Sequence, residues 1–201
     1  MGVNLPGDPP PKATSARNPR ADAQRNRERL IAVAKTEFAR VGTDVTLEEI
    51  ARRAQVGIGT LYRHFPTRDA IVEAVYRREV EQLSQAAPRL LETATPAEAL
   101  RQWLRLLVDY VATKKLMASA LGSLAGGPSS LFAVSGTRIT DALTALIQAA
   151  VATGEIRADV EPIDLMRAMW GFASGGEGWQ ASALRLIDIL MDGLVADRSR
   201  P

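Results

Sequence analysis

Apolar residues recur at steps of three and four positions along most of the 201-residue chain, which is the period of an amphipathic α-helix. No segment sustains the alternation of a half-buried β-strand. The pattern therefore predicts an all-α protein of about nine helices. They are expected over residues 22–41, 46–55, 58–65, 68–86, 96–115, 116–125, 130–153, 162–174 and 179–196. Residues 88–96 are expected to form a connection that holds at most one helical turn.

Capping residues and prolines support these boundaries. Thr46 and Glu49 form a capping box, with the threonine as N-cap and the glutamate at the third helical position. Pro66 ends the helix before it, because the residue that precedes a proline leaves the α region. Thr67 is predicted to cap the long helix that follows. Pro96 suits the first position of a helix.

Residues 43–68 contain two short helices joined by a turn around Gly57. The second helix is too short and too polar to be a core helix, and small residues at its start would let another molecule approach closely. Its exposed positions are expected to carry Thr60, Tyr62, Arg63 and His64, while Leu61 and Phe65 are expected in the core. This is the arrangement of a helix-turn-helix, whose second helix enters the DNA major groove.

The segment 25–75 also closely resembles the TetR (tetracycline repressor-like) family of transcriptional regulators. The motif Thr-x-x-Glu-Ile-Ala is followed by Gly-x-x-Thr-Leu-Tyr-x-His-Phe. The resembling residues are Phe38, Gly42, Thr46, Ile50, Ala51, Ala54, Val56, Gly57, Thr60, Leu61, Tyr62, His64, Phe65 and Asp69. The resemblance implies an N-terminal three-helix DNA-binding domain over 21–66 and a C-terminal effector-binding and dimerisation domain over 67–201.

The resemblance also implies which residues contact DNA. They are Thr46, Arg52, Ile58, Gly59, Thr60, Tyr62, His64 and Arg68. Ile58, Gly59 and Thr60 are expected to lie toward base edges, where thymine methyl groups and weak hydrogen bonds are available. The hydroxyl, imidazole and guanidinium groups of the other five suit phosphates, which fix the register of a protein on DNA. For Arg52, a solvated surface position remains the alternative.

Charge and composition add to this picture. Residues 1–64 carry 11 Lys and Arg against seven Asp and Glu, whereas residues 65–201 carry a net charge of −2. The excess of positive charge in residues 1–64 suggests that this part of the chain binds a polyanion. Residues 1–20 contain five prolines and are expected to form a disordered arm. Arg17 and Arg20 in this arm are either inert or reach the minor groove, as homeodomain arms do.

The absence of cysteine and the single histidine, His64, exclude disulfide scaffolds, thiolate zinc sites and cysteine nucleophiles. We therefore expect no catalytic site, no metal and no cofactor. The uncharged stretch 116–137 is long enough to span a membrane. Its glycines and proline favour two buried helices joined by a loop instead. The N-terminus lacks the apolar region of a signal peptide, so a cytoplasmic protein is expected.

The C-terminal part gathers aromatic and methionine side chains that are expected to line a pocket for a small-molecule effector. The candidates are Trp103, Leu107, Tyr110, Met117, Phe132, Arg138, Met166, Met169 and Trp170. For any single apolar member of this set, ordinary core packing is the alternative. Asp109 is a further candidate polar contact.

Residues 162–196 are expected to pair with a second copy of the chain. The candidate contacts are Leu165, Met169, Leu184, Ile187, Leu190, Met191 and Leu194. A two-fold dimer would place two recognition helices on a near-palindromic operator. An effector that moves the long helix after Thr67 would release the DNA, so a ligand-responsive repressor is expected. The alternatives are an effector-free DNA-binding structural or recombinase module, and a helical enzyme that uses the same fold.

Overall fold

The computed structural model describes residues 19–124 and 129–195. These residues form nine helices and one isolated β-bridge, between Ile156 and Val195. The predicted all-α fold is confirmed. Most of the expected arm, residues 1–18, lies outside the described part. Pro19 and Arg20 begin the first helix instead of ending the arm, because a proline suits the first turn, where no intrahelical donor is needed.

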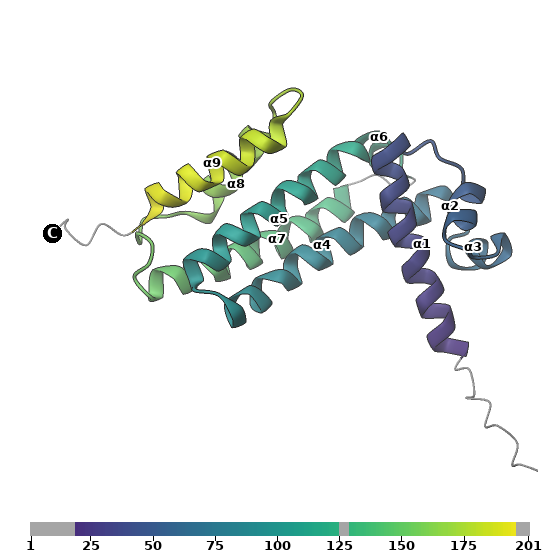
Figure 1. Cartoon of the computed structure of the whole chain (residues 1–201), viewed down its shortest axis with the longest axis horizontal. Coiled ribbons are helices and arrows are strands. Elements are labelled where there is room, and N and C mark those ends of the chain that lie inside the picture. Colours follow the sequence, from purple (N-terminus) through teal and green to yellow (C-terminus); the bar gives the residue numbers. More distant parts are fainter. Residues whose placement is uncertain (1–18, 125–128, 196–201) are drawn as a thin grey trace, which may run out of the picture.

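The first three helices form a unit at one end of the molecule (Figure 1). They are α1 (Pro19–Val41), α2 (Leu47–Arg53) and α3 (Ile58–His64), and each packs against the other two. Leu61 and Phe65 are buried between them, as predicted. The predicted N-cap of α2 is confirmed, since the hydroxyl oxygen of Thr46 accepts the backbone N–H of Glu49 at 3.2 Å.

The remaining helices form an elongated bundle. They are α4 (Arg68–Thr93), α5 (Pro96–Leu116), α6 (Ala118–Gly122), α7 (Ser129–Ala152), α8 (Pro162–Ala173) and α9 (Trp179–Leu194). Helices α4, α5 and α7 pack on one another, and the pair α8–α9 covers α5 and α7 (Figure 1). Helix α1 packs on α4 and joins the first unit to the bundle.

Helix α4 continues through Pro88 to Thr93, so the predicted connection over 88–96 is wrong. Pro88 itself is exposed, while Ala87 is buried and Leu90 and Leu91 pack against the core. The apolar stripe of the helix thus extends beyond the proline. Its burial outweighs the loss of one backbone donor, because tertiary packing supplies most of the stability of a helix in a protein.

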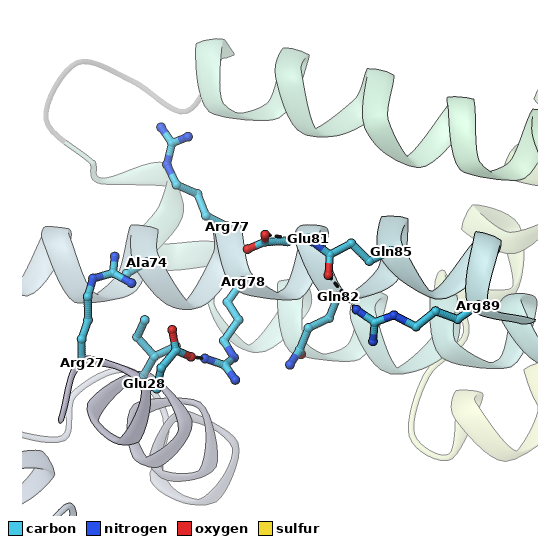
Figure 2. A pocket seen from close by; sticks show the side chains of 10 residues that line it. Arg27, Glu28, Ala74, Arg77, Arg78, Glu81, Gln82, Gln85 and Arg89 are labelled. Carbon is cyan, nitrogen blue, oxygen red and sulfur yellow. Dashed lines mark hydrogen bonds and ion pairs between the residues drawn. The ribbon is translucent and has the colours of Figure 1, made fainter. Parts of the chain in front are cut away.

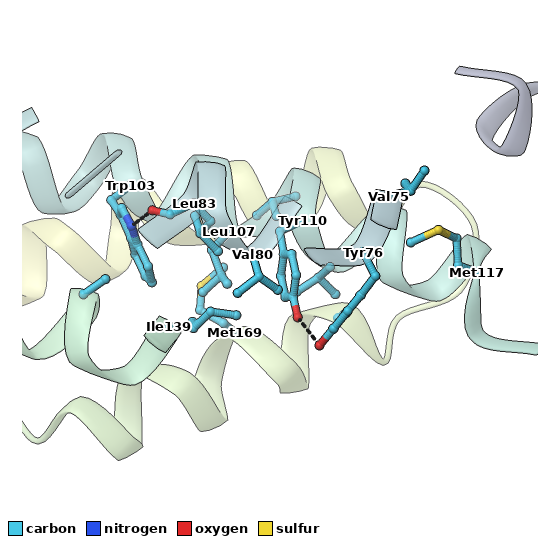
Figure 3. Close-up of a cluster of buried hydrophobic side chains, with 14 of the residues drawn as sticks. Val75, Tyr76, Val80, Leu83, Trp103, Leu107, Tyr110, Met117, Ile139 and Met169 are labelled. Carbon is cyan, nitrogen blue, oxygen red and sulfur yellow. Dashed lines mark hydrogen bonds between the residues drawn. The ribbon is translucent and has the colours of Figure 1, made fainter. Parts of the chain in front are cut away.

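Trp103 belongs to the cluster of buried side chains in the bundle (Figure 3). This side chain is fully buried, and its indole Nε1 donates to the backbone oxygen of Leu83 at 2.9 Å. The bond joins α5 to α4 and satisfies the one polar atom of the ring.

An ion-pair network fastens α9 to α5. Arg101 contacts Asp188 at 2.9 Å and Asp192 at 3.2 Å, and Arg105 contacts Asp188 at 2.7 Å. The guanidinium groups of Arg105 and Arg101 lower the pKa of Asp188. These ion pairs link the exposed edges of α9 and α5.

Most of the residues expected at a dimer interface point into the protein instead. Five of the seven are buried within their own chain: Leu165, Met169, Ile187, Met191 and Leu194. Their assignment to an interface is wrong, because these side chains face the bundle, where α9 packs on α5 and α8 packs on α5 and α7. Among the predicted contacts, Leu184 is exposed and Leu190 is half-buried.

Candidate nucleic-acid interface

A buried acid holds α1 and α2 together. Glu37 of α1 is buried and pairs with Arg40 at 2.8 Å and with Arg53 of α2 at 3.1 Å. A buried carboxylate is strongly destabilising without such partners, so both arginines have a structural role. The charge of Arg53, adjacent to the predicted DNA contact Arg52, is therefore engaged inside the unit.

Residues 54–57 form the turn between α2 and α3. The residue with positive φ is Gln55, at 54°, whereas Gly57 has a φ of −61° and precedes the first residue of α3. The turn expected around Gly57 is thus centred two residues earlier. The backbone N–H of Val56 donates to the oxygen of Ala51 at 3.0 Å, which closes α2 in the manner of a Schellman motif.

One face of α3 is buried and the other is open. Leu61 fills the core, whereas Ile58 and Tyr62 are 41% and 44% exposed. Thr60 and His64 are half-buried on the same helix. The residues predicted to contact DNA from this helix therefore reach the surface.

Gly57 and Gly59 lie at the open start of α3. A Cβ atom at either position would meet no other atom within 4 Å, and neither residue has a positive φ. Glycine inside a helix costs about 1 kcal/mol relative to alanine. No neighbour in the described protein explains Gly59, which is inside α3. Close approach of a molecule outside the chain would explain both glycines.

The hydroxyl of Tyr62 donates to the carboxylate of Glu48 in α2 at 3.2 Å. This hydrogen bond, together with the negative charge of Glu48, raises the pKa of Tyr62. The bond orients the hydroxyl at the open face of the unit. A phosphate oxygen that arrived there could replace Glu48 as the acceptor, because both groups accept hydrogen bonds.

Arg52 and Thr46 lie on the exposed side of α2. The guanidinium of Arg52 makes two hydrogen bonds of 2.7 Å to Glu49. Hydrogen bonds from Arg52 and Arg53 lower the pKa of Glu49 to about 2. The hydroxyl oxygen of Thr46 accepts from the Glu49 backbone, which leaves its proton available to an outside acceptor.

Arg68 points into the protein rather than toward the open face. Its Nη1 donates to the backbone oxygen of Val45 at 2.7 Å. Its Nη2 is buried and has no hydrogen-bond partner within the described residues. The guanidinium thereby joins the start of α4 to the loop before α2. A phosphate contact by Arg68 stays a prediction.

A cleft of about 450 Å³ lies between the first turns of α1 and the open face of α3. It is lined by Asp22, Ala23, Asn26, Thr60, Arg63 and His64. Thr60 and His64 thus border the same open space. The sequence analysis missed Asn26, because no local pattern indicates which part of α1 lies beside a helix more than thirty residues later.

A second cleft, of about 470 Å³, lies between α1 and α4 (Figure 2). Across it, Arg78 of α4 pairs with Glu28 of α1. Near it, Lys35 of α1 contacts the buried Glu79 of α4 at 2.6 Å. These two ion pairs join α1 of the first unit to α4. The sequence analysis missed both pairs, since each joins positions more than forty residues apart.

The residues expected to line an effector pocket are divided between core and surface. Trp103, Leu107, Met117 and Met169 are buried core residues. Arg138 is exposed, and Met166 is half-buried. Their role in ligand binding stays a prediction.

Two residues outside the predicted set, Tyr76 and Lys114, lie beside aromatic members of that set. Tyr76 is near Tyr110 and Phe132, and Lys114 is near Phe132 and Trp170. The hydroxyls of Tyr76 and Tyr110 are 3.0 Å apart in the core (Figure 3). The ring of Phe132 packs edge-on against Tyr76, with 5.6 Å between centroids. Lys114 places its Nζ 4.6 Å from the Phe132 ring and 4.9 Å from the Trp170 ring. An ammonium group and two hydroxyl groups thus lie beside Phe132.

Comparisons with known proteins agree with this arrangement. A family model described as bacterial regulatory proteins, tetR family, matches residues 30–75. A model described as the C-terminal domain of SbtR-like transcriptional regulators matches residues 95–196.

Two solved structures are similar over nearly their whole length. The TetR transcriptional regulator SCO0520 from Streptomyces coelicolor is 45% identical, with 85% of this chain and 99% of that chain covered and a TM-score of 0.77. The TetR transcription regulatory protein from Mycobacterium vanbaalenii is 34% identical, with 88% and 98% covered and a TM-score of 0.72. The HTH-type transcriptional regulator SAR0097 from Staphylococcus aureus is 29% identical over 104 residues, and the chain spans about half its length.

A helix-turn-helix unit with an open second helix, joined to a separate helical bundle, defines a DNA-binding transcriptional regulator rather than an enzyme. The chain belongs to the TetR family, as its sequence predicts. Within residues 19–124 and 129–195, no helix has the length and hydropathy needed to cross a membrane. The same residues contain no group of three or more metal-ligating side chains suited to a metal ion.

Proposed function

We propose that the protein is a repressor that binds a near-palindromic operator as a homodimer and releases it when a small molecule binds the C-terminal bundle. The open start of α3 is the observation that carries the DNA-binding part. Gly57 and Gly59 leave the backbone accessible there, and no described residue packs against either position. The N-terminus of a recognition helix is the part that contacts base edges.

The surrounding side chains divide into two roles. Ile58 and Thr60 at the start of α3 face the bases, where Thr60 can donate or accept a hydrogen bond. Tyr62, His64 and Thr46 flank them and donate to phosphates. Arg52 joins them once a phosphate replaces Glu49 as its partner.

The outer surface of α8 and α9 supports the dimer. Ile163 of α8 and Leu184 and Ile189 of α9 are exposed, and Ile189 has 67% of its surface accessible. Several large apolar side chains on one helix pair are typical of a surface that a partner covers. A two-fold axis there would set the recognition helices about 34–36 Å apart on DNA.

The path from ligand to DNA runs through α4. Its C-terminal half packs in the bundle, and its N-terminal half is joined to α1 by the pairs Lys35–Glu79 and Glu28–Arg78. A ligand that binds better when α4 is displaced shifts the population toward that state. Because the first three helices are joined to α4, they move with it. The spacing of the two recognition helices in the dimer then no longer fits the operator.

The experiment begins with selection of an operator from random duplex DNA by the full chain. Affinities for that operator and for unrelated DNA are then measured at one salt concentration. Tyr62→Phe is expected to cost about 1 kcal/mol on both DNAs, because it removes one hydrogen bond. Thr60→Ala is expected to cost about 1–3 kcal/mol on the operator alone.

Thr137→Ala is the matched control, since Thr137 is exposed on α7 of the bundle and its hydroxyl bonds only within its own helix. It should leave both affinities unchanged. A specificity ratio that Thr60→Ala does not alter would refute the proposed reading role of Thr60. Selection that yields no dyad-related half-sites would refute binding as a two-fold dimer.

A further inference from the structure

Lys114 lies between two aromatic rings where α5, α7 and α8 meet. Its Nζ is within 5 Å of the centroids of Phe132 and Trp170. No oxygen atom of the described residues accepts a hydrogen bond from it. The adjacent Lys115 differs, because its ammonium donates to the backbone oxygen of Ala173 at 2.6 Å.

The surroundings of Lys114 leave its hydrogen-bonding capacity unused. An ammonium group has three N–H donors. Aromatic faces attract a cation but accept hydrogen bonds only weakly. The side chain is half-buried, and burial lowers the pKa of Lys114. The neighbouring rings therefore hold a partly desolvated cation that an anion would stabilise.

A second polar group lies against the same aromatic cluster. Tyr76 and Tyr110 are buried, and their hydroxyls share one hydrogen bond of 3.0 Å. Two hydroxyl groups carry two protons, so one proton has no acceptor among the described residues. The Tyr76 ring packs on Phe132, which in turn contacts Lys114. Each neighbour of Phe132 thus has an N–H or O–H donor that no described residue accepts.

We propose that Lys114 anchors the carboxylate of an amphipathic acid whose apolar part packs on Phe132 and Trp170. This inference rests on the proposed ligand response and names the chemical class of the ligand. One ammonium matches the single charge of a carboxylate. The aromatic side chains around it match an apolar body, whereas a phosphate dianion is better matched by several arginines.

The test uses the full chain and three acids, namely benzoate, 2-naphthoate and octanoate. Each is paired with its neutral primary amide. Thermal unfolding first shows which compounds stabilise the protein, because a ligand selective for the folded state raises the melting temperature. Titration calorimetry then gives the affinity of each stabilising acid for the parent and for three variants, Lys114→Met, Lys114→Arg and Lys115→Met.

We expect at least one acid to stabilise the parent while its amide does not. Lys114→Met should weaken that acid by about tenfold to hundredfold, the size expected for a charge-assisted hydrogen bond. Lys114→Arg should restore part of the affinity, and Lys115→Met should retain it. The proposal is overturned if no acid binds better than its amide, or if Lys114→Met and Lys115→Met weaken it equally.

Operator affinity measured with and without the acid separates this inference from the proposed function. Lys114-dependent binding that leaves operator affinity unchanged would support the carboxylate site and refute its role as an effector site. A neutral compound that releases operator DNA from both the parent and Lys114→Met, with no acid binding, would support the regulator and refute the carboxylate anchor.

Discussion

The ion pair between Lys35 and Glu79 is expected to couple the DNA-binding unit to the bundle energetically. The two charged atoms are 2.6 Å apart, and the side chains of Lys35 and Glu79 are 42% and 7% exposed. At an effective dielectric constant of about 20, their Coulomb attraction is about 6 kcal/mol before desolvation is subtracted. Lys35→Met removes this attraction but leaves Glu79 buried.

The net effect is smaller than the Coulomb term, because water can reach Glu79 from the side that Lys35 leaves exposed. Removal of one partner from a fully buried pair costs about 3–5 kcal/mol, so we expect about 2–3 kcal/mol for Lys35→Met. Glu79→Gln should cost about 1 kcal/mol, since Lys35 can then turn to solvent. The double variant should cost little more than Glu79→Gln, which gives a coupling energy of about 2 kcal/mol.

Urea unfolding of the four proteins at one protein concentration measures this cycle, and operator affinity is measured in parallel. A fixed concentration is needed because the stability of a dimer depends on it. Lys35→Met is expected to weaken operator binding as well as folding. Free energies that add to within about 0.5 kcal/mol would refute the coupling, whatever the size of the single effects.

Three further changes test the fold. Gln55→Gly should stabilise the protein by about 0.5–1 kcal/mol, because a φ of 54° strains a residue with a Cβ atom; a lower urea midpoint than that of the parent would contradict this. Pro88→Ala should stabilise by about 1–2 kcal/mol, since proline in a helix interior costs about 3 kcal/mol relative to alanine and the freer unfolded chain offsets part of the gain; an unchanged melting temperature would count against it. Because the folded-state pKa of Asp188 is lowered, its contribution to stability is complete above the ordinary aspartate pKa of about 3.9 and is lost as the pH falls through the lowered value. In urea unfolding at a series of pH values, Asp188→Asn should therefore lose less stability than the parent as the pH falls below about 3.9. Identical pH dependence in the two proteins would argue against a lowered pKa of Asp188 beside Arg105.

The sequence was sufficient to predict the helices and the helix-turn-helix, because those features depend on neighbouring residues. Thr46 caps α2 and Thr67 caps α4 through bonds to residues three positions later. Pro96 begins α5, as its position predicts. The predicted end of the helix before Pro88 is wrong, because the effect of a proline on a helix depends on whether the residues beyond it pack against the core.

Features that depend on contacts between distant segments could not be predicted. The pairing of Lys35 with Glu79 and the inward position of Arg68 both depend on how α1, α2 and α4 meet. The same limitation explains the error on α9, where Ile187 is buried and Ile189 is exposed. A helix with two apolar stripes gives no local sign of which stripe faces its own bundle.

If Tyr62 and Arg52 contact phosphates as proposed, Glu48 and Glu49 oppose DNA binding, because they already bind Tyr62 and Arg52 in the free protein. Each carboxylate competes with a DNA phosphate for the same donor. Because the carboxylate belongs to the same chain as that donor, its effective concentration there is set by the fold and not by the solution. The two acids would therefore weaken binding to operator and to unrelated DNA alike.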